Sequence, residues 1–101
     1  MSTPEGKVKR KVSDYLRTLG PDCWYFMPVS TGYGAKSLDY IGCYQGKAFA
    51  IETKAPGNKL TPLQESTVTR MRAAGMHVSI VFDYDSLELM KAWFEGGDAC
   101  H

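Results

Sequence analysis

Apolar residues recur every three or four positions over the first twenty residues, which predicts an amphipathic helix. Ser2 or Thr3 can cap its start, Pro4 suits its first turn, and Glu5 opposes the helix dipole. Gly20-Pro21 is expected to end it. The apolar stripe consists of Val8, Val12, Tyr15, Leu16 and Leu19.

Three short segments then read as strands. The first is aromatic, Cys23–Met27, and a glycine-containing loop over residues 28–37 follows it. Leu38–Tyr44 and Lys47–Lys54 flank the turn Gln45-Gly46, so they are expected to form a hairpin. Pairing about that turn joins positions whose numbers add up to 91.

A second helix begins at a capping box, in which Thr61 is the cap and Gln64 the third helical residue, and Gly75 ends it. The continuous apolar run Met76–Phe82 predicts a strand buried on both faces, with His77 packed in it. Asp83 or Asp85 is expected to cap a last helix, Ser86–Phe94. The inner stripe predicted for the second helix consists of Leu63, Thr67, Met71 and Ala74.

The element order is helix, three strands, helix, strand, helix. The crossover from the third strand through the second helix to the fourth is expected to be parallel and right-handed. The sequence therefore predicts an α/β fold, a mixed central β-sheet flanked by helices, in a single domain over residues 1–101.

Composition and charge bear on three questions: metal binding, cellular compartment and the kind of partner. Three scattered cysteines without a CxxC pair favour reduced thiols and argue against a zinc site. No apolar run predicts a membrane span or secretion signal, so a cytoplasmic protein is expected, in a bacterium or a virus-infected cell. Residues 1–72 carry a net charge of +5 and residues 73–101 carry −4, which is compatible with a polyanionic partner or with two solvated faces.

The most informative charges lie within the hairpin. Glu52 and Lys54 are two apart on a strand that otherwise reads as buried, so they share a face, and the expected register puts Asp39 opposite Glu52. Two adjacent carboxylates repel unless a cation lies between them, and Mg²⁺ or Mn²⁺ accepts such oxygen ligands. The Thr53 carbonyl could add another oxygen, and Lys54 could stabilise charge on a phosphate.

A structural explanation is also open, in which the same residues form a salt bridge on a solvated sheet face. The acidic-x-lysine triplet is common and would not by itself distinguish the two. The apolar flanks, the hairpin register and the following helix start together favour a site.

Asp39, the run from Ile51 to Lys54, and Gln64 resemble the core of PD-(D/E)XK nucleases, with the VRR-NUC branch the most similar. The resemblance implies a restriction-endonuclease-like core with Asp39 and Glu52 as metal ligands and Lys54 as a catalytic residue. It also implies supporting roles for Glu5, at the metal, and Gln64. Helix-dipole stabilisation explains Glu5 equally well, and the capping box explains Gln64. Leu38 stands where the motif's name has proline.

The resemblance implies a DNA endonuclease, with branched DNA such as a Holliday junction or flap as the favoured substrate. It also implies a homodimer, for which the apolar stripe of the last helix is one possible face, although such a stripe is usually core. Cleavage of linear duplex, a place in a larger machine, and a non-catalytic nucleic-acid-binding module stay open. Candidate DNA contacts, each also explained as solvated surface, are Lys7, Lys11, Tyr33, Lys36 and Lys59.

Overall fold

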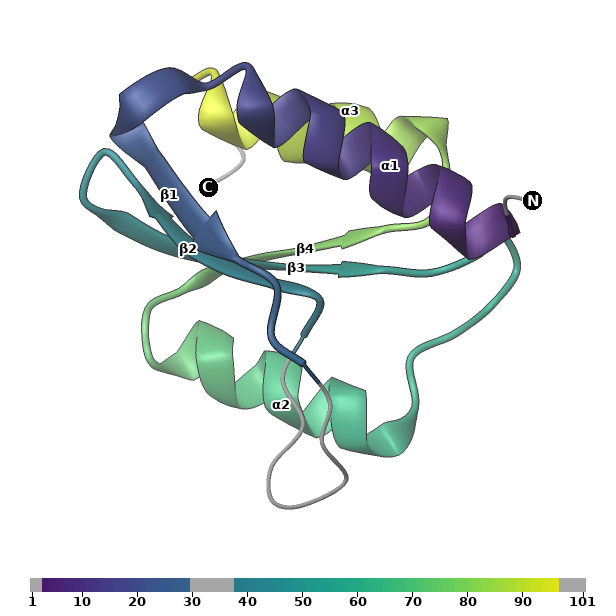
Figure 1. The fold of residues 1–101 in the computed structure, drawn as a ribbon. Coiled ribbons are helices and arrows are strands. Elements are labelled where there is room, and N and C mark those ends of the chain that lie inside the picture. Colours follow the sequence, from purple (N-terminus) through teal and green to yellow (C-terminus); the bar gives the residue numbers. More distant parts are fainter. Residues whose placement is uncertain (1–2, 30–37, 97–101) are drawn as a thin grey trace.

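A four-stranded sheet lies between two layers of helix in the computed structural model, which describes residues 3–29 and 38–96 (Figure 1). The first and last helices cover one face of the sheet, and the middle helix covers the other. None of the described helices is long and apolar enough to cross a membrane. The elements are α1 (Pro4–Arg17), a 3-10 turn (Gly20–Asp22), β1 (Cys23–Phe26), β2 (Tyr40–Tyr44), β3 (Lys47–Thr53), α2 (Pro62–Ala73), β4 (His77–Val81) and α3 (Tyr84–Phe94).

The sheet has the strand order β1-β2-β3-β4, antiparallel except for the parallel pair β3–β4. The predicted hairpin and register are confirmed, since Tyr40 pairs with Ile51 and Tyr44 with Lys47. The turn residues Gln45 and Gly46 both have positive φ, 49° and 82°. A two-residue turn of this kind matches the twist of the strands and thereby fixes their register. The predicted parallel crossover through α2 is also confirmed.

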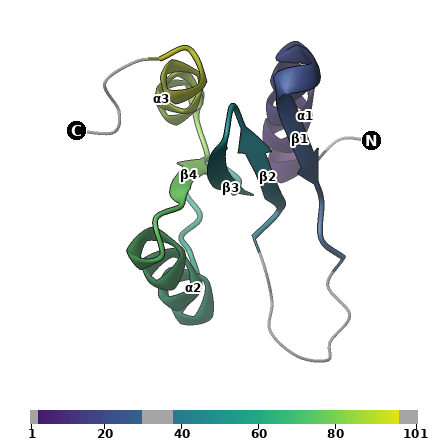
Figure 2. The same ribbon diagram turned by 90° about the vertical axis from the view of Figure 1, so that its left-hand side faces the viewer.

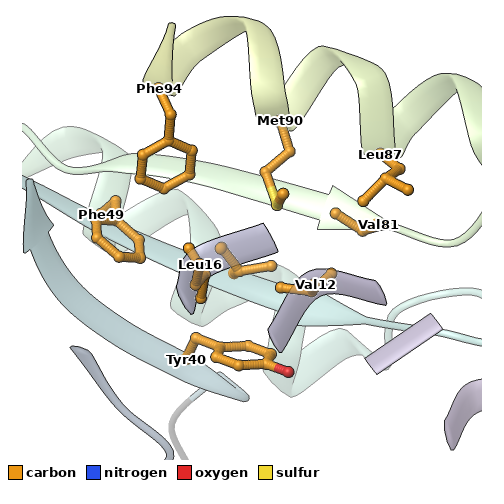
Figure 3. Close-up of a cluster of buried hydrophobic side chains, with 9 residues drawn as sticks. Val12, Leu16, Tyr40, Phe49, Val81, Leu87, Met90 and Phe94 are labelled. Carbon is orange, nitrogen blue, oxygen red and sulfur yellow. The ribbon is translucent and has the colours of Figure 1, made fainter. Parts of the chain in front are cut away.

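Figure 2 shows α1 and α3 on one side of the sheet and α2 on the other, and a hydrophobic cluster fills each of the two interfaces. The larger joins α1 and α3 to the sheet, and Figure 3 shows its side chains converging from both helices onto the strands. Phe94 meets Phe49 edge to face, with ring centroids 4.9 Å apart, a favourable aromatic geometry. The smaller cluster joins α2 to the sheet through Leu38, Ala50, Val68 and Val78.

Helix caps define where the elements begin. The Thr3 hydroxyl accepts a hydrogen bond from the Gly6 amide, and the Asp83 carboxylate accepts one from the Ser86 amide, both 2.9 Å long. Asp83 rather than Asp85 therefore caps α3, which begins at Tyr84, two residues before the predicted start. The capping box of Thr61 and Gln64 is present as predicted.

Several predicted details are wrong. Strand β2 begins at Tyr40, so Leu38 and Asp39 precede it. Leu63 and Ala74 of the stripe predicted for α2 are exposed, and Val68 is the buried residue instead. The α2 sequence has little helical periodicity of its own, so contacts with the sheet decide which face is inside.

Strand β4 is an edge strand, although its sequence reads as buried. Helices α2 and α3 cover its two faces, which accounts for the apolar run, but within residues 3–29 and 38–96 only one edge pairs, with β3. The Val81 carbonyl accepts from the Lys54 amide, so the Val78 carbonyl points to the open edge. There it accepts a hydrogen bond from the Arg72 guanidinium, 3.0 Å long.

The apolar stripe of α3 belongs to the core. Leu87, Met90 and Phe94 are buried in the larger cluster. Trp93 packs beside them and stacks on the half-buried His77, with ring centroids 4.4 Å apart. The stripe is therefore not available as a dimer face, and His77 packs as predicted.

We expect Gly42→Ala to destabilise the fold by roughly 1–3 kcal/mol, because overpacking forces neighbours apart. A Cβ at this position would clash with the Trp24 carbonyl oxygen and lie 2.7 Å from the Phe49 ring and 2.8 Å from the Tyr25 Cβ. Urea unfolding measures the change. Cys43→Ala, at the next and exposed position of β2, is the control and should alter stability little. Equal stability of the two variants would contradict the close approach.

Candidate functional site

The end of the β2–β3 hairpin brings Asp39 and Glu52 together. The two residues stand at the next pair position of the hairpin, one step beyond the Tyr40–Ile51 pair. The Asp39 amide donates a hydrogen bond of 3.1 Å to Oε1 of Glu52. The hairpin thus places the backbone of one acidic residue against the carboxylate of the other.

The Asp39 carboxylate is held by Thr53. Its Oδ2 accepts from the Thr53 amide at 3.0 Å and from the Thr53 hydroxyl at 2.5 Å. Oδ2 therefore replaces a β2 backbone carbonyl as the partner of β3. This explains why the regular ladder stops at Tyr40. Instead of lying on one strand face with Ile41 and Cys43, as predicted, the Asp39 side chain closes the end of the strand.

Glu52 is buried, with only 4% of its surface exposed. Its Oε2 accepts a hydrogen bond of 2.9 Å from Nε2 of Gln64 and lies 3.9 Å from the Lys54 ammonium. Each of its two oxygens therefore has a donor partner. The predicted face shared by Glu52 and Lys54 lies toward α2, the opposite side of the sheet from α1.

Gln64 serves the helix and the carboxylate with different atoms. Its Oε1 accepts from the Thr61 amide at 2.9 Å, which completes the capping box. This bond fixes the orientation of the amide group, so that Nε2 points to Glu52. The two explanations offered for Gln64, capping and a contact at the site, are therefore compatible.

Burial, together with the smaller effect of the nearby Asp39 charge, raises the pKa of the Glu52 carboxyl from its ordinary 4.5 to about 7. The Asp39 amide and the Lys54 ammonium oppose the rise, and Glu5 adds a weaker repulsion. The ionised carboxylate is thus destabilised near neutrality unless a proton or a cation accompanies it. Such a group is chemically suited to hold a cation.

Lys9 is a residue of this site that the sequence did not single out. Its ammonium lies 3.8 Å from Oδ1 of Asp39. Its carbonyl accepts a 2.9 Å hydrogen bond from the Tyr40 hydroxyl, which is 2.6 Å from the Ser13 hydroxyl. Positions 5, 9 and 13 are four apart and lie on one face of a helix. That spacing groups Lys9 with Glu5 and Ser13, but it does not by itself distinguish Lys9 from the neighbouring basic residues of the helix.

Glu5 is not joined to the pair. It acts on the Glu52 pKa through its charge, but no side-chain hydrogen bond links the two in the described part of the chain. Among the described residues, no three His, Cys, Asp or Glu side chains form a group that could hold a metal. Two carboxylates are nevertheless compatible with Mg²⁺, which commonly binds one or two carboxylates together with phosphate and water.

The predicted DNA contacts lie in different places. Lys7 and Lys11 are exposed on α1, and Lys59 is exposed in the segment before α2. Tyr33 and Lys36 lie outside the described residues. The Thr53 carbonyl stays a predicted ligand, since the contacts that fix this residue use its amide and hydroxyl.

Comparison with known proteins identifies the fold. A solved structure described as a VRR_NUC domain superimposes with a TM-score of 0.74, covering 91% of this chain and 99% of that one. The chain has the fold of a VRR_NUC domain. This confirms the predicted restriction-endonuclease-like core. The sequences are 21% identical, and neither a family model nor a curated protein matches the chain.

We expect the Glu52 carboxyl of the protein in EDTA to titrate near pH 7, as measured by ¹³C chemical shifts of labelled glutamate. Folding raises this pKa, so the stability that Glu52 contributes is fully present below about pH 4.5 and is lost as the pH rises through about 7. Asp39→Asn should lower the pKa of Glu52, because it removes a negative charge and keeps the amide donor. An ordinary pKa near 4.5 in the parent protein would contradict the burial argument.

Proposed function

We propose that this protein is a DNA endonuclease of the PD-(D/E)XK type that uses Mg²⁺ or Mn²⁺ to hydrolyse phosphodiester bonds. The observation that carries the proposal is a buried carboxylate, Glu52, held beside Asp39, Lys54 and Gln64 at the end of a hairpin. The VRR_NUC-like fold supports it. The cytoplasm is the proposed setting.

The residues at this site fit a divalent cation. Asp39 and Glu52 supply oxygen ligands, and the raised pKa of Glu52 reflects first its burial and then the nearby charge of Asp39. A cation bound between the two carboxylates would stabilise the ionised form of Glu52. A bound metal would supply an acidic water molecule and compensate charge on the phosphate. Among the described residues, Oδ1 of Asp39 has a single, loose contact, with Lys9, so we propose it as the first ligand oxygen for a cation.

The residues around the two carboxylates would then have separate roles. Gln64 orients Glu52 through a bond fixed by the helix cap, and Thr53 orients Asp39. Lys54, which neighbours Glu52, is the proposed partner for the charge that builds on the phosphate. Glu5 is proposed as a supporting residue, acting through its charge on the same site.

A second candidate function is a non-catalytic nucleic-acid-binding module. Within the described residues, every buried side-chain nitrogen and oxygen atom already has a hydrogen-bond partner. The polar cluster is thus complete as a structural element of the hairpin. Exposed lysines on α1 would then bind DNA without cleavage.

Cleavage assays separate the two functions. We expect the parent protein to cut DNA with Mg²⁺ or Mn²⁺ and not with EDTA, and Asp39→Asn and Glu52→Gln to reduce the rate by about 100-fold or more, because each removes a charged ligand. The asparagine retains an acceptor for Thr53. Glu65→Gln, on the exposed side of α2, is the matched control and should cut normally.

The outcomes are distinct. A parent protein that binds DNA but cuts none of the linear, flap or four-way substrates with either metal would favour the binding module. If both variants cut as fast as the parent, the activity is real and the site lies elsewhere.

We further propose that the protein acts as a homodimer on branched DNA, because a two-fold dimer places one site on each of two strands. The core position of Leu87, Met90 and Phe94 requires any dimer to use another surface. Sedimentation equilibrium at micromolar concentration should give twice the monomer mass of 11.2 kDa. A monomer, alone and with four-way DNA, would contradict the dimer. Equal cleavage of linear and branched substrates would contradict the substrate preference.

A further inference from the structure

A cavity of about 380 Å³ opens between the start of α1 and the start of α3. Figure 1 places both helix starts at the end of the sheet where β3 and β4 finish. Three apolar side chains form the floor of the cavity: Val8 of α1, Val81 of β4 and Leu87 of α3. The cavity therefore lies on the face of the sheet opposite to α2.

The cavity and the candidate active site share one stretch of backbone. The Lys54 amide donates a 3.0 Å hydrogen bond to the carbonyl of Val81 at the cavity floor. Pro56, two residues after Lys54, lines the cavity itself. The backbone that carries Lys54 therefore adjoins the cavity.

The walls of the cavity carry opposite charges. Lys7 and Lys11 are exposed, four residues apart on the α1 wall. On the α3 wall Asp83 is ionised, because hydrogen bonds from Ser86 lower the pKa of its carboxyl. That carboxylate is turned to the Ser86 amide and hydroxyl. The anionic end of a ligand would therefore lie at the α1 wall, beside the two lysines and away from the Asp83 carboxylate.

Two aromatic residues complete the α3 wall. Phe82 is 38% exposed and Tyr84 is 72% exposed. Exposed aromatic rings beside cationic side chains are typical of surfaces that stack single-stranded bases and bind their phosphates. The volume is near the lower end of the range for small-ligand sites, so it suits one small ligand.

We propose that this cavity receives one unpaired nucleotide of the DNA strand being cut. The phosphate of this nucleotide lies against Lys7 and Lys11. Its nucleobase lies on the apolar floor of the cavity, beside Phe82 and Tyr84. This inference rests on the proposed nuclease function and specifies its substrate. A paired base cannot enter without leaving the stack, so DNA with unpaired nucleotides beside the cut is favoured over continuous duplex.

Binding is tested first without metal or cleavage. The protein in EDTA is titrated with dAMP, and amide chemical shifts are followed by NMR. We expect changes at Val8, Phe82 and Leu87, with millimolar affinity, and binding at least about tenfold weaker for deoxyadenosine or inorganic phosphate alone, because each lacks half of the contacts. Lys7→Glu with Lys11→Glu should abolish the changes. Lys47→Glu, at the far end of β3, is the charge control and should retain them.

Cleavage is tested second, with flap DNA that carries either a normal nucleotide or an abasic residue beside the cut. The parent protein should cut the normal flap at least about tenfold faster, because base stacking is lost at the abasic residue. Tyr84→Ala should remove this preference. Leu89→Ala, also exposed on α3 but outside the cavity, should keep it.

The two proposals fail in different ways. If the parent cuts DNA but dAMP shifts no cavity residue and the abasic flap is cut equally fast, the cavity inference is wrong and the nuclease stands. If the parent cuts nothing while dAMP binds as expected, the nuclease proposal fails and the cavity is a nucleotide site of a binding module. Shifts at Gln64 and Lys54 alone would also overturn the inference.

Discussion

The structure depends on how Asp39 completes the β2–β3 hairpin. Its amide donates to Glu52 while its carboxylate accepts from Thr53, so one residue fastens both sides of the end of β3. A buried carboxylate and a buried strand end each require hydrogen-bond partners. Here the Asp39 amide is a donor for the buried Glu52 carboxylate, and the Asp39 carboxylate is an acceptor for the amide of Thr53 at the strand end. The same geometry that closes the sheet gathers the polar atoms from which a metal site can be built.

Helix α2 is tied to this arrangement through a single amide group. Gln64 caps the helix with its oxygen and approaches Glu52 with its nitrogen. Movement of the helix start would therefore alter the hydrogen bonding of Glu52, and a change in the charge of Glu52 would act on the helix start. A capping box usually affects only helix stability. In this protein it also determines which polar atom faces the buried carboxylate.

The parts of the fold with local causes could be predicted from the sequence. The turn at Gln45-Gly46 determines the hairpin register, and caps and glycines mark the helices. The inner face of α2 could not be predicted, because Leu63 is the better core residue by hydrophobicity, whereas Glu52 needs a donor in that direction. The β2 boundary was missed because an aspartate side chain there takes the place of a backbone carbonyl.

The candidate site was predicted to the same extent. The shared face of Glu52 and Lys54 follows from strand alternation, and the position of Asp39 opposite Glu52 follows from the hairpin register; both causes are local. The direction of the Asp39 side chain does not follow from alternation, because that side chain bonds Thr53 at the strand end. The contact of Lys9 with Asp39 depends on how α1 lies across the sheet. Four basic residues crowd that helix between positions 7 and 11, and hydrophobic pattern alone does not say which one turns inward. Tertiary placement of a helix against a strand end is needed to choose among them.

The open edge of β4 has a consequence for assembly. An apolar edge strand can add a strand from another molecule and so begin aggregation. The Arg72 guanidinium donates a hydrogen bond to the Val78 carbonyl on that edge. An incoming strand would need the same carbonyl as an acceptor for one of its own amides, and it would also meet the positive charge of Arg72. Sheet extension through β4 must first displace this side chain. Arg72 therefore opposes the addition of a strand at this edge of the sheet.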